Sequence, residues 1–336
     1  MVPHSKFFVS LLVTALFLAP AFAQDAALIE AAKKEGGRAV VYGSLESRPI
    51  EMIEKAFQRK TGLRVDYWRA SATKIMDRAM SEYRAGKPLF DVITTITDPI
   101  RLMSKDGIFA RYDSPSAKAF AKETVDLELG PRYRNVIIGV VYNKGVIKPE
   151  NAPKSLEDIV KPQYKGKLVM PDPTQHTTTT QWLANLHKIM GKERADKFIR
   201  DLAAMKPILV ESLLPSAERV MTGETPIAIT YVKYAYIFGR EGANLDYLRD
   251  PRMLGDGSYI TLSRKAPHPN AGKALIDFFL GPESMDILAK DGEFVNRKGI
   301  YPPLPDADKI GFLQMEDLGR KGYAEKKKEY SKIFLK

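Results

Sequence analysis

Three short apolar segments of the sequence end in polar residues that could bind an anion. The polar side chains at these three places are Ser44, Ser71, Thr73, His176, Thr177 and Thr178. If each apolar segment is a strand that leads into a helix, the helix N-terminus presents unpaired backbone N–H groups and the positive end of the helix dipole. A hydroxyl group beside such amides suits the oxygen atoms of a carboxylate, a phosphate or a carbonate. The pattern therefore predicts an anion-binding site.

A fourth polar group follows the apolar residues 227–229. Tyr231, Lys233 and Tyr234 stand close together there. The ammonium group of Lys233 is a suitable partner for an anion, and the tyrosines can add hydrogen bonds or a flat contact surface. An ordinary structural role also accounts for these patterns, because tyrosines that alternate with apolar residues suit a half-buried strand and serine or threonine often caps a helix. The sequence leaves both interpretations open.

The elements that must position these residues alternate in the first third of the chain. We predict helices at residues 25–35, 49–61 and 73–85, and strands at residues 38–43, 63–68 and 90–95. Strands separated by helices of this length form βαβ units with a mainly parallel sheet. In such open sheets, ligands gather beyond the carboxyl ends of the strands, which is where the polar residues stand.

The remainder of the chain predicts a second α/β unit. We expect extended segments at residues 107–112, 134–142, 167–170, 227–231 and 250–262. We expect helices at residues 178–190, 193–204, 216–222, 269–280 and 282–291, and a helical tail from residue 312. Because 336 residues exceed what one hydrophobic core usually organises, the length also favours two lobes.

The N-terminus has the pattern of a secretory signal. Lys6 precedes an apolar run at residues 7–19, and Ala21, Phe22 and Ala23 follow it. We therefore predict that residues 1–23 are a signal peptide, that cleavage occurs near Ala23, and that the mature protein is periplasmic. The apolar run is too short to cross a bilayer. The sequence contains no cysteine, which leaves it without disulfides or a lipidated cysteine anchor.

The composition argues against nucleic-acid binding and against catalysis. The formal net charge is +11, but the charges interleave along the chain and no groove-reading motif accompanies them. The sequence has no nucleophile elbow and no glycine-rich nucleotide motif, and His176 and His187 lack a metal-ligand spacing. We expect no nucleic-acid partner, no resident cofactor and no catalytic residues. An exported enzyme or lyase on the same fold is the remaining alternative from another class.

Five segments carry a family resemblance, in the same order along the chain. They are residues 40–47, 141–143, 153–158, 164–167 and 266–283, the last of which begins Ala-Pro-His-Pro-Asn-Ala-Gly-Lys. Together they resemble the type 2 periplasmic solute-binding proteins of ABC importers, most closely the ferric-binding branch. The resemblance implies an α/β fold with two lobes, two hinge strands and an interlobe ligand cleft. It implies a first lobe at residues 24–112 plus 258–336 and a second lobe at residues 113–257.

The resemblance also bears on metal binding. In the ferric-binding branch two adjacent tyrosines bind iron, and the matching positions here are Lys233 and Tyr234. The metal-binding histidine of the branch falls on Glu46, and its carboxylate ligand falls on Thr73. Ferric iron prefers anionic oxygen ligands, and the Lys233 ammonium adds a positive charge beside a trivalent cation. Glu46 and Tyr234 are the residues left for iron, as part of a site that a chelator completes.

The resemblance and the polar residues together predict a binding protein. We expect a monomeric receptor that captures a small anionic solute between its lobes and delivers it to an inner-membrane ABC permease. The alternative within the same family is a receptor for ferric iron or a ferric chelate, in which iron is the transported ligand.

Overall fold

The computed structural model describes residues 19–297 and 300–335. The core of the predicted signal peptide lies in residues 1–18, outside the described residues. The first described helix, α1 (Ala19–Lys34), includes the predicted cleavage position near Ala23. Among the described helices, none is long and apolar enough to cross a membrane.

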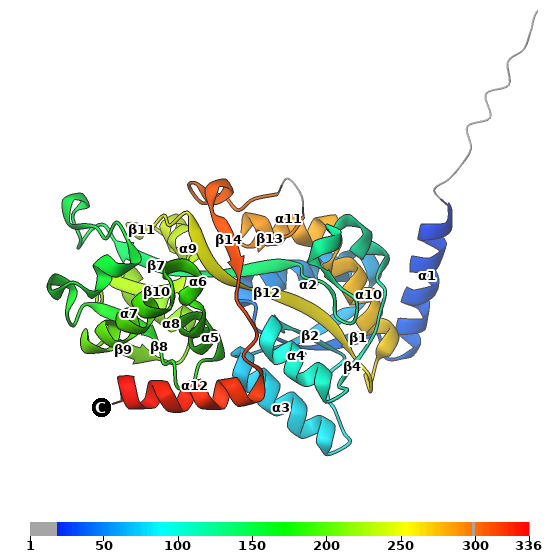
Figure 1. Ribbon diagram of the computed structural model, residues 1–336. Helices are drawn as coiled ribbons and strands as arrows, with labels where there is room; N and C mark the ends of the chain where they lie inside the picture. Colours follow the sequence, from blue (N-terminus) through cyan, green and yellow to red (C-terminus); the bar gives the residue numbers. More distant parts are fainter. Residues whose placement is uncertain (1–18, 298–299, 336) are drawn as a thin grey trace, which may run out of the picture.

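A mixed sheet runs through both halves of the molecule (Figure 1). Its strands follow the order β2-β1-β3-β12-β7-β10-β8-β9. The bounds of these strands are β1 (Arg38–Gly43), β2 (Arg64–Arg69), β3 (Val92–Ile96), β7 (Arg134–Asn143), β8 (Leu168–Pro171), β9 (Ile208–Val210), β10 (Ile227–Tyr231) and β12 (Arg252–Ser263). Short strands at the margins are β4 (Phe109–Ala110), β11 (Leu245–Tyr247), β13 (Phe294–Val295) and β14 (Gly311–Gln314), and β5 (Val125–Asp126) pairs separately with β6 (Gly130–Pro131).

Helices cover the sheet in both halves. Those of the first half are α1, α2 (Ser47–Thr61), α3 (Ala72–Arg84), α4 (Thr97–Lys105), α10 (Pro269–Phe279) and α11 (Pro282–Lys290). Those of the second half are α5 (Thr177–Asn185), α6 (His187–Met190), α7 (Lys192–Ala204), α8 (Leu213–Thr222), α9 (Tyr234–Arg240) and α12 (Gly319–Phe334). The predicted βαβ pattern is confirmed, because β1 pairs in parallel with both β2 and β3.

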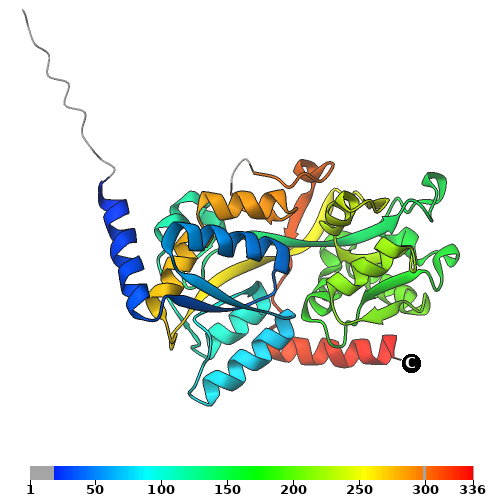
Figure 2. The same cartoon turned by 180° about the vertical axis from the view of Figure 1, so that it is seen from behind.

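Two long strands join the halves. The first residues of β7 pair with β12, at residues 134–137 and 255–258, and its later residues pair with β10. The other part of β12, residues 258–262, pairs with β3 in the first half. Each strand therefore belongs to both halves, as expected of hinge strands. The C-terminal segment crosses as well, since β14 pairs with β12 and leads to α12, which packs against α5 and α7 (Figures 1 and 2).

The predicted lobe boundaries stay a prediction, but the packing indicates where they need adjustment. Phe120 and Tyr133 belong to the hydrophobic core of the first half, so residues 113–133 pack with that half instead of the second. Tyr330 of α12 belongs to the core of the second half, although residues 258–336 were expected in the first. Each segment packs with the half that was not predicted for it, because its apolar side chains are buried in the hydrophobic core of that half.

Some elements of the structure differ from the sequence prediction. Helices α4 and α9 were not predicted, and the helix expected at residues 178–190 is divided into α5 and α6. The predicted helical tail begins only at Gly319, because residues 311–314 form β14 and pair with residues 252–255 of β12. Pairing with a distant strand is a tertiary interaction that local sequence periodicity does not contain.

A buried carboxyl group lies on the hinge strand β12. Gln314 Nε2 donates to Asp256 Oδ1 at 2.9 Å, whereas Asp256 Oδ2 has no hydrogen-bond partner among the described residues. Burial raises the pKa of Asp256 to about 7, against the opposing effect of nearby polar groups such as the Gln314 amide. The carboxyl group is therefore protonated in the folded protein at pH values where it is ionised in the unfolded chain.

This difference predicts a pH dependence of stability. From about pH 4 to pH 7 the folded state binds a proton at Asp256 that the unfolded state has released, so the free energy of unfolding contributed by this group falls as the pH rises. Asp256→Asn removes the titration. As the pH rises from 5 to 8, we expect the free energy of unfolding of the variant, measured by urea unfolding, to increase by at least about 1 kcal/mol relative to that of the wild type. If the difference in the free energy of unfolding between variant and wild type is the same at pH 5 and pH 8, Asp256 does not titrate with a raised pKa.

Candidate functional site

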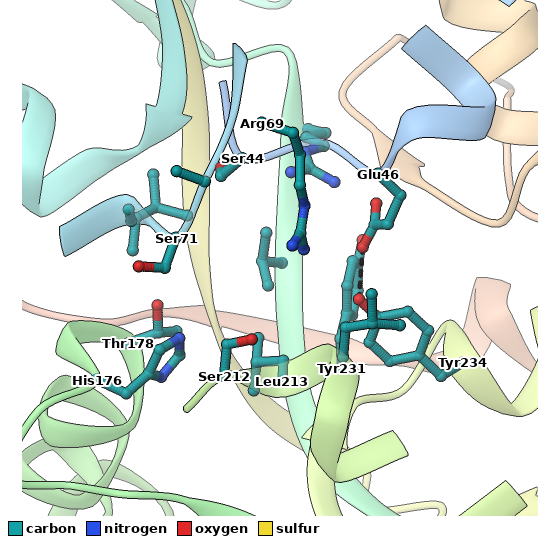
Figure 3. A pocket seen from close by; sticks show the side chains of 16 residues that line it. Ser44, Glu46, Arg69, Ser71, His176, Thr178, Ser212, Leu213, Tyr231 and Tyr234 are labelled. Carbon is teal, nitrogen blue, oxygen red and sulfur yellow. Dashed lines mark hydrogen bonds between the residues drawn. The ribbon is translucent and has the colours of Figure 1, made fainter. Parts of the chain in front are cut away.

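A pocket lies between the two halves (Figure 3). Its lining comes from the ends of β1 and β2 on one side and from the segments before α5, α8 and α9 on the other. Arg134 and Val136 of the hinge strand β7 also line it. The pocket therefore occupies the position between the lobes that the sequence predicted for a ligand cleft.

Five helix N-termini meet at this pocket. The residue that immediately precedes each helix lines the pocket in every case: Glu46 before α2, Ser71 before α3, Ile96 before α4, His176 before α5 and Ser212 before α8. Helix N-termini carry free backbone N–H groups and a partial positive charge. Their convergence makes the pocket electrostatically favourable for negative charge.

Most of the predicted site residues line the pocket. These are Ser44, Glu46, Ser71, His176, Thr178, Tyr231 and Tyr234. Thr73 and Thr177 do not line it, but their hydroxyl oxygens lie 3.5 Å apart, with Thr73 on α3 and Thr177 on α5. They form a contact between the halves beside the pocket. Nearby, Lys74 Nζ lies 2.8 Å from Glu211 Oε1 and forms a second such contact, both side chains being exposed.

Lys233 takes a different position from the one the sequence suggested. Its side chain is fully buried and does not line the pocket. The ammonium group donates to Glu46 Oε2 at 2.7 Å and also to Glu293 Oε1. Lys233 therefore lies behind Glu46, where it pairs with two carboxylates of the protein.

Glu293 connects this ion pair to the hinge. Its side chain is fully buried, accepts a hydrogen bond of 2.8 Å from Tyr231 and forms an ion pair with Arg134. The Tyr231 hydroxyl oxygen also lies 2.9 Å from the carbonyl oxygen of Asn135 on β7, so its one proton is shared between these two acceptors. Two carboxylates and two cations thus form a compact buried network at one end of the pocket. Such a network is balanced in charge only while all four groups are present.

Glu46 is ionised and Tyr234 is neutral at this end. Burial alone would raise the pKa of Glu46, but attraction to Lys233 and Arg134 outweighs it and lowers the pKa to about 2. Burial and the negative charge of Glu46 raise the pKa of Tyr234 well above its ordinary range. Tyr234 therefore stays protonated, and its hydroxyl group donates a hydrogen bond to Glu46 Oε1.

The His176 imidazole is neutral, and its Nε2–H group is a hydrogen-bond donor. The backbone N–H of Thr179 donates to His176 Nδ1 at 3.3 Å, so Nδ1 is an acceptor and the ring proton is on Nε2. Burial, followed by repulsion from Lys327, lowers the pKa of His176 to about 4. The imidazole consequently contributes hydrogen bonding without a charge near neutral pH.

Four polar or charged residues of the site were missed by the sequence interpretation: Arg69, Arg134, Ser212 and Glu293. Arg69 directly follows the predicted strand at residues 63–68, so the same strand-end rule that selected Ser71 could have found it. Arg134 begins an apolar strand, where a buried guanidinium needs a partner. Ser212 follows β9, which was not predicted. Nothing in the local sequence indicates that Glu293 meets Lys233.

The donor set does not form a simple metal centre. Within residues 19–297 and 300–335, no group of three or more histidine, cysteine, aspartate or glutamate side chains is arranged to hold a metal ion. Glu46 and Tyr234 do lie together, as the iron alternative requires. Glu46, however, also accepts from the Lys233 ammonium, which places a positive charge beside the position of a ferric ion.

The fold and the interlobe pocket define the class of periplasmic binding proteins. The family model described as bacterial extracellular solute-binding protein matches residues 87–319. The chain therefore belongs to this family, which serves ABC transporters from outside the cytoplasm. The predicted resemblance and the two-lobed α/β fold are both confirmed.

Relatives of the chain are distant in sequence. An uncharacterized protein of Haemophilus influenzae (strain ATCC 51907 / DSM 11121 / KW20 / Rd) is 21% identical over 271 residues, which cover 76% of this chain and 77% of that protein. The periplasmic binding protein AfuA from Actinobacillus pleuropneumoniae, solved with exogenous fructose 6-phosphate bound, has a TM-score of 0.79 and 18% identity, over 89% of this chain and 99% of AfuA. Iron-bound HitA from Pseudomonas aeruginosa has a TM-score of 0.73 and 21% identity, over 87% of this chain and 99% of HitA.

Proposed function

We propose that this protein is the periplasmic receptor of an ABC importer and that it captures a small anionic solute. The solute binds in the pocket between the lobes and is then delivered to an inner-membrane permease. The mature protein acts as a monomer after removal of the signal peptide near Ala23. The proposed ligand contacts are Ser44, Glu46, Ser71, His176, Thr178, Tyr231 and Tyr234, with Arg69, Arg134 and Ser212 added from the structure. Thr73 and Thr177 support closure of the cleft beside the ligand, and Lys233 supports Glu46.

The observation that carries the proposal is the convergence of five helix N-termini on a pocket lined by two arginines. Arg69 forms no ion pair with another described residue, so its charge remains available to a ligand. Arg134 Nε is buried and has no hydrogen-bond partner among the described residues. The only carboxylate among the described residues that line the pocket, Glu46, is already neutralised by Lys233. The net field in the pocket therefore favours an anion.

The two halves contribute to the same pocket, and this explains how binding favours closure. Ser71 and Arg69 come from the first half, whereas His176 and Ser212 come from the second. A ligand can contact both groups only when the lobes are closed, so it stabilises that form by its additional contacts there. AfuA, which shares the fold, was solved with the phosphate ester fructose 6-phosphate bound, and this agrees with an anionic ligand.

Ferric iron is less well supported as the ligand. The phenol of Tyr234 holds its proton and Lys233 is buried against Glu46, so iron binding would have to displace a proton and compete with an ammonium. The iron-bound neighbour HitA is 21% identical, a level at which the likeness concerns the fold.

Thermal unfolding of the purified mature protein tests the proposal. The panel contains inorganic phosphate, sulfate, citrate, gluconate, fructose 6-phosphate, ferric citrate and the neutral sugar fructose. A solute present at 100 times its Kd should stabilise the protein by about 2.7 kcal/mol and raise the Tm by several degrees. We expect at least one anion to do so and fructose to have no effect.

Three results would contradict the proposal. Stabilisation by neutral or cationic solutes with none by anions would exclude an anion receptor. A visible absorption band that appears only with ferric iron would favour the iron alternative. Chemical conversion of a bound anion during prolonged incubation would instead identify an enzyme on this fold.

A further inference from the structure

The pocket has two ends of different electrostatic character (Figure 3). Ser71, His176 and Thr178 lie at one end, and Glu46, Tyr231 and Tyr234 lie at the other, with Arg69 reaching in between them. The first end, called here the cationic end, is defined by Ser71, His176 and Thr178. The second, called here the carboxylate end, is defined by Glu46, Tyr231 and Tyr234.

The cationic end owes its name to the partial positive charge of two helix N-termini, and no carboxylate of the pocket lies there. The helices α3 and α5 begin there, with Ser71 and His176 as their N-caps. Each of these helices has at least nine residues, and the Arg69 side chain reaches in between this end and the carboxylate end. An anionic group bound here receives backbone and guanidinium donors together.

The carboxylate end is already balanced in charge. Glu46 and Glu293 contribute two negative charges, and Lys233 and Arg134 contribute two positive charges. A second anionic group of a ligand would gain no net attraction at this end. It would also lie against the Glu46 carboxylate, which lines the pocket and is 17% exposed.

Glu46 has room for additional hydrogen-bond donors. One oxygen accepts from Tyr234 and the other from Lys233, which uses two of about four acceptor positions of a carboxylate. A ligand hydroxyl group can occupy a remaining position. A ligand ammonium group would be disfavoured, because Lys233 Nζ already lies 2.7 Å from the same carboxylate.

We propose that Glu46 is a specificity-determining residue that selects solutes with one anionic head group and a neutral, hydroxylated body. The head group, a phosphate or a carboxylate, binds at the cationic end, and hydroxyl groups of the body donate to Glu46 at the carboxylate end. Solutes with a second anionic group are rejected there. This inference rests on the proposed function as an anion receptor.

Isothermal titration calorimetry with matched pairs of probes tests the inference on the wild-type protein. The phosphate pair is fructose 6-phosphate and fructose 1,6-bisphosphate, and the carboxylate pair is gluconate and glucarate. In at least one pair we expect the solute with a single anionic group to bind at least about tenfold more tightly than its doubly anionic partner. Glucosamine 6-phosphate should bind more weakly than glucose 6-phosphate.

Glu46→Gln should change this selectivity in a defined direction. The substitution leaves Lys233 and Arg134 with only Glu293, so the carboxylate end gains one net positive charge. In each pair that shows a preference, the Kd of the doubly anionic solute divided by the Kd of the singly anionic solute should fall by at least about tenfold. The control is Glu211→Gln, which removes a negative charge beside the cleft from a residue that does not line the pocket. It should leave the ratio unchanged.

The outcomes separate this inference from the proposed function. If inorganic phosphate, sulfate or citrate binds but neither singly anionic probe does, the anion receptor stands and the hydroxylated class is wrong. If a singly anionic probe binds but neither pair shows a preference for its singly anionic member in the wild-type protein, the role of Glu46 is also overturned. If no anion binds, the proposed function itself fails. Should Glu46→Gln not fold, the wild-type comparison alone decides.

Discussion

Replacing Lys233 with methionine is expected to lower the free energy of unfolding by about 3–5 kcal/mol. The fully buried ammonium pairs with Glu46 and Glu293, so its removal leaves two carboxylates that Arg134 alone must balance. An uncompensated charge in a buried position is costly, and protonation of one carboxyl group is the route by which the protein can reduce the cost. The loss of stability should therefore be smaller at pH 5 than at pH 8. Urea unfolding at the two pH values measures both effects.

Lys74→Met is the matched control for this prediction. Lys74 also pairs with a carboxylate across the cleft, at 2.8 Å from Glu211, but both side chains are 62% exposed. Exposed ion pairs contribute less than about 1 kcal/mol. If Lys233→Met and Lys74→Met destabilise the protein equally, the buried network does not have the importance that its geometry indicates.

Removing Arg69 should weaken anion binding most strongly while leaving the fold intact. Arg69 lies at the end of β2, lines the pocket and forms no ion pair with another described residue. A hydrogen bond to a charged partner contributes about 1.5–3 kcal/mol, so Arg69→Ala should raise the Kd for the bound anion by about 10- to 150-fold. The Tm of the unliganded protein should change little. Calorimetry with the anion that gives the largest thermal shift measures the change.

Arg64→Ala provides the control for charge alone. Arg64 begins the same strand, is exposed and does not line the pocket. Its removal lowers the net charge of the protein by the same amount but should alter the Kd by less than about twofold, since exposed charges outside the pocket are screened by salt. Equal effects of the two substitutions would mean that the anion responds to the overall charge and not to the pocket.

The order of strands and helices could be predicted from the sequence wherever capping residues, glycine or proline mark the ends of an element. Strand β1 has the predicted bounds, and α2, α3, α10 and α11 begin and end within about two residues of expectation, because N-caps and glycine or proline stops mark their ends. Gly62, for example, ends α2 in a left-handed conformation with φ at 74°, where an L-residue with a side chain is strained. The polar residues at the strand ends followed from the same rules.

The sequence by itself determined the two-lobed class, the extracellular solute-binding family and seven of the sixteen described residues that line the pocket, because strand–helix junctions and family segments are local patterns. Only the tertiary structure decided that Lys233 faces Glu46 and Glu293 and not the pocket, and that Arg134 joins them. Glu46, Lys233 and Glu293 are separated by 187 and 60 residues along the chain. Their pairing depends on burial and on charge balance at the contact of two lobes, and neither quantity exists until the chain has folded.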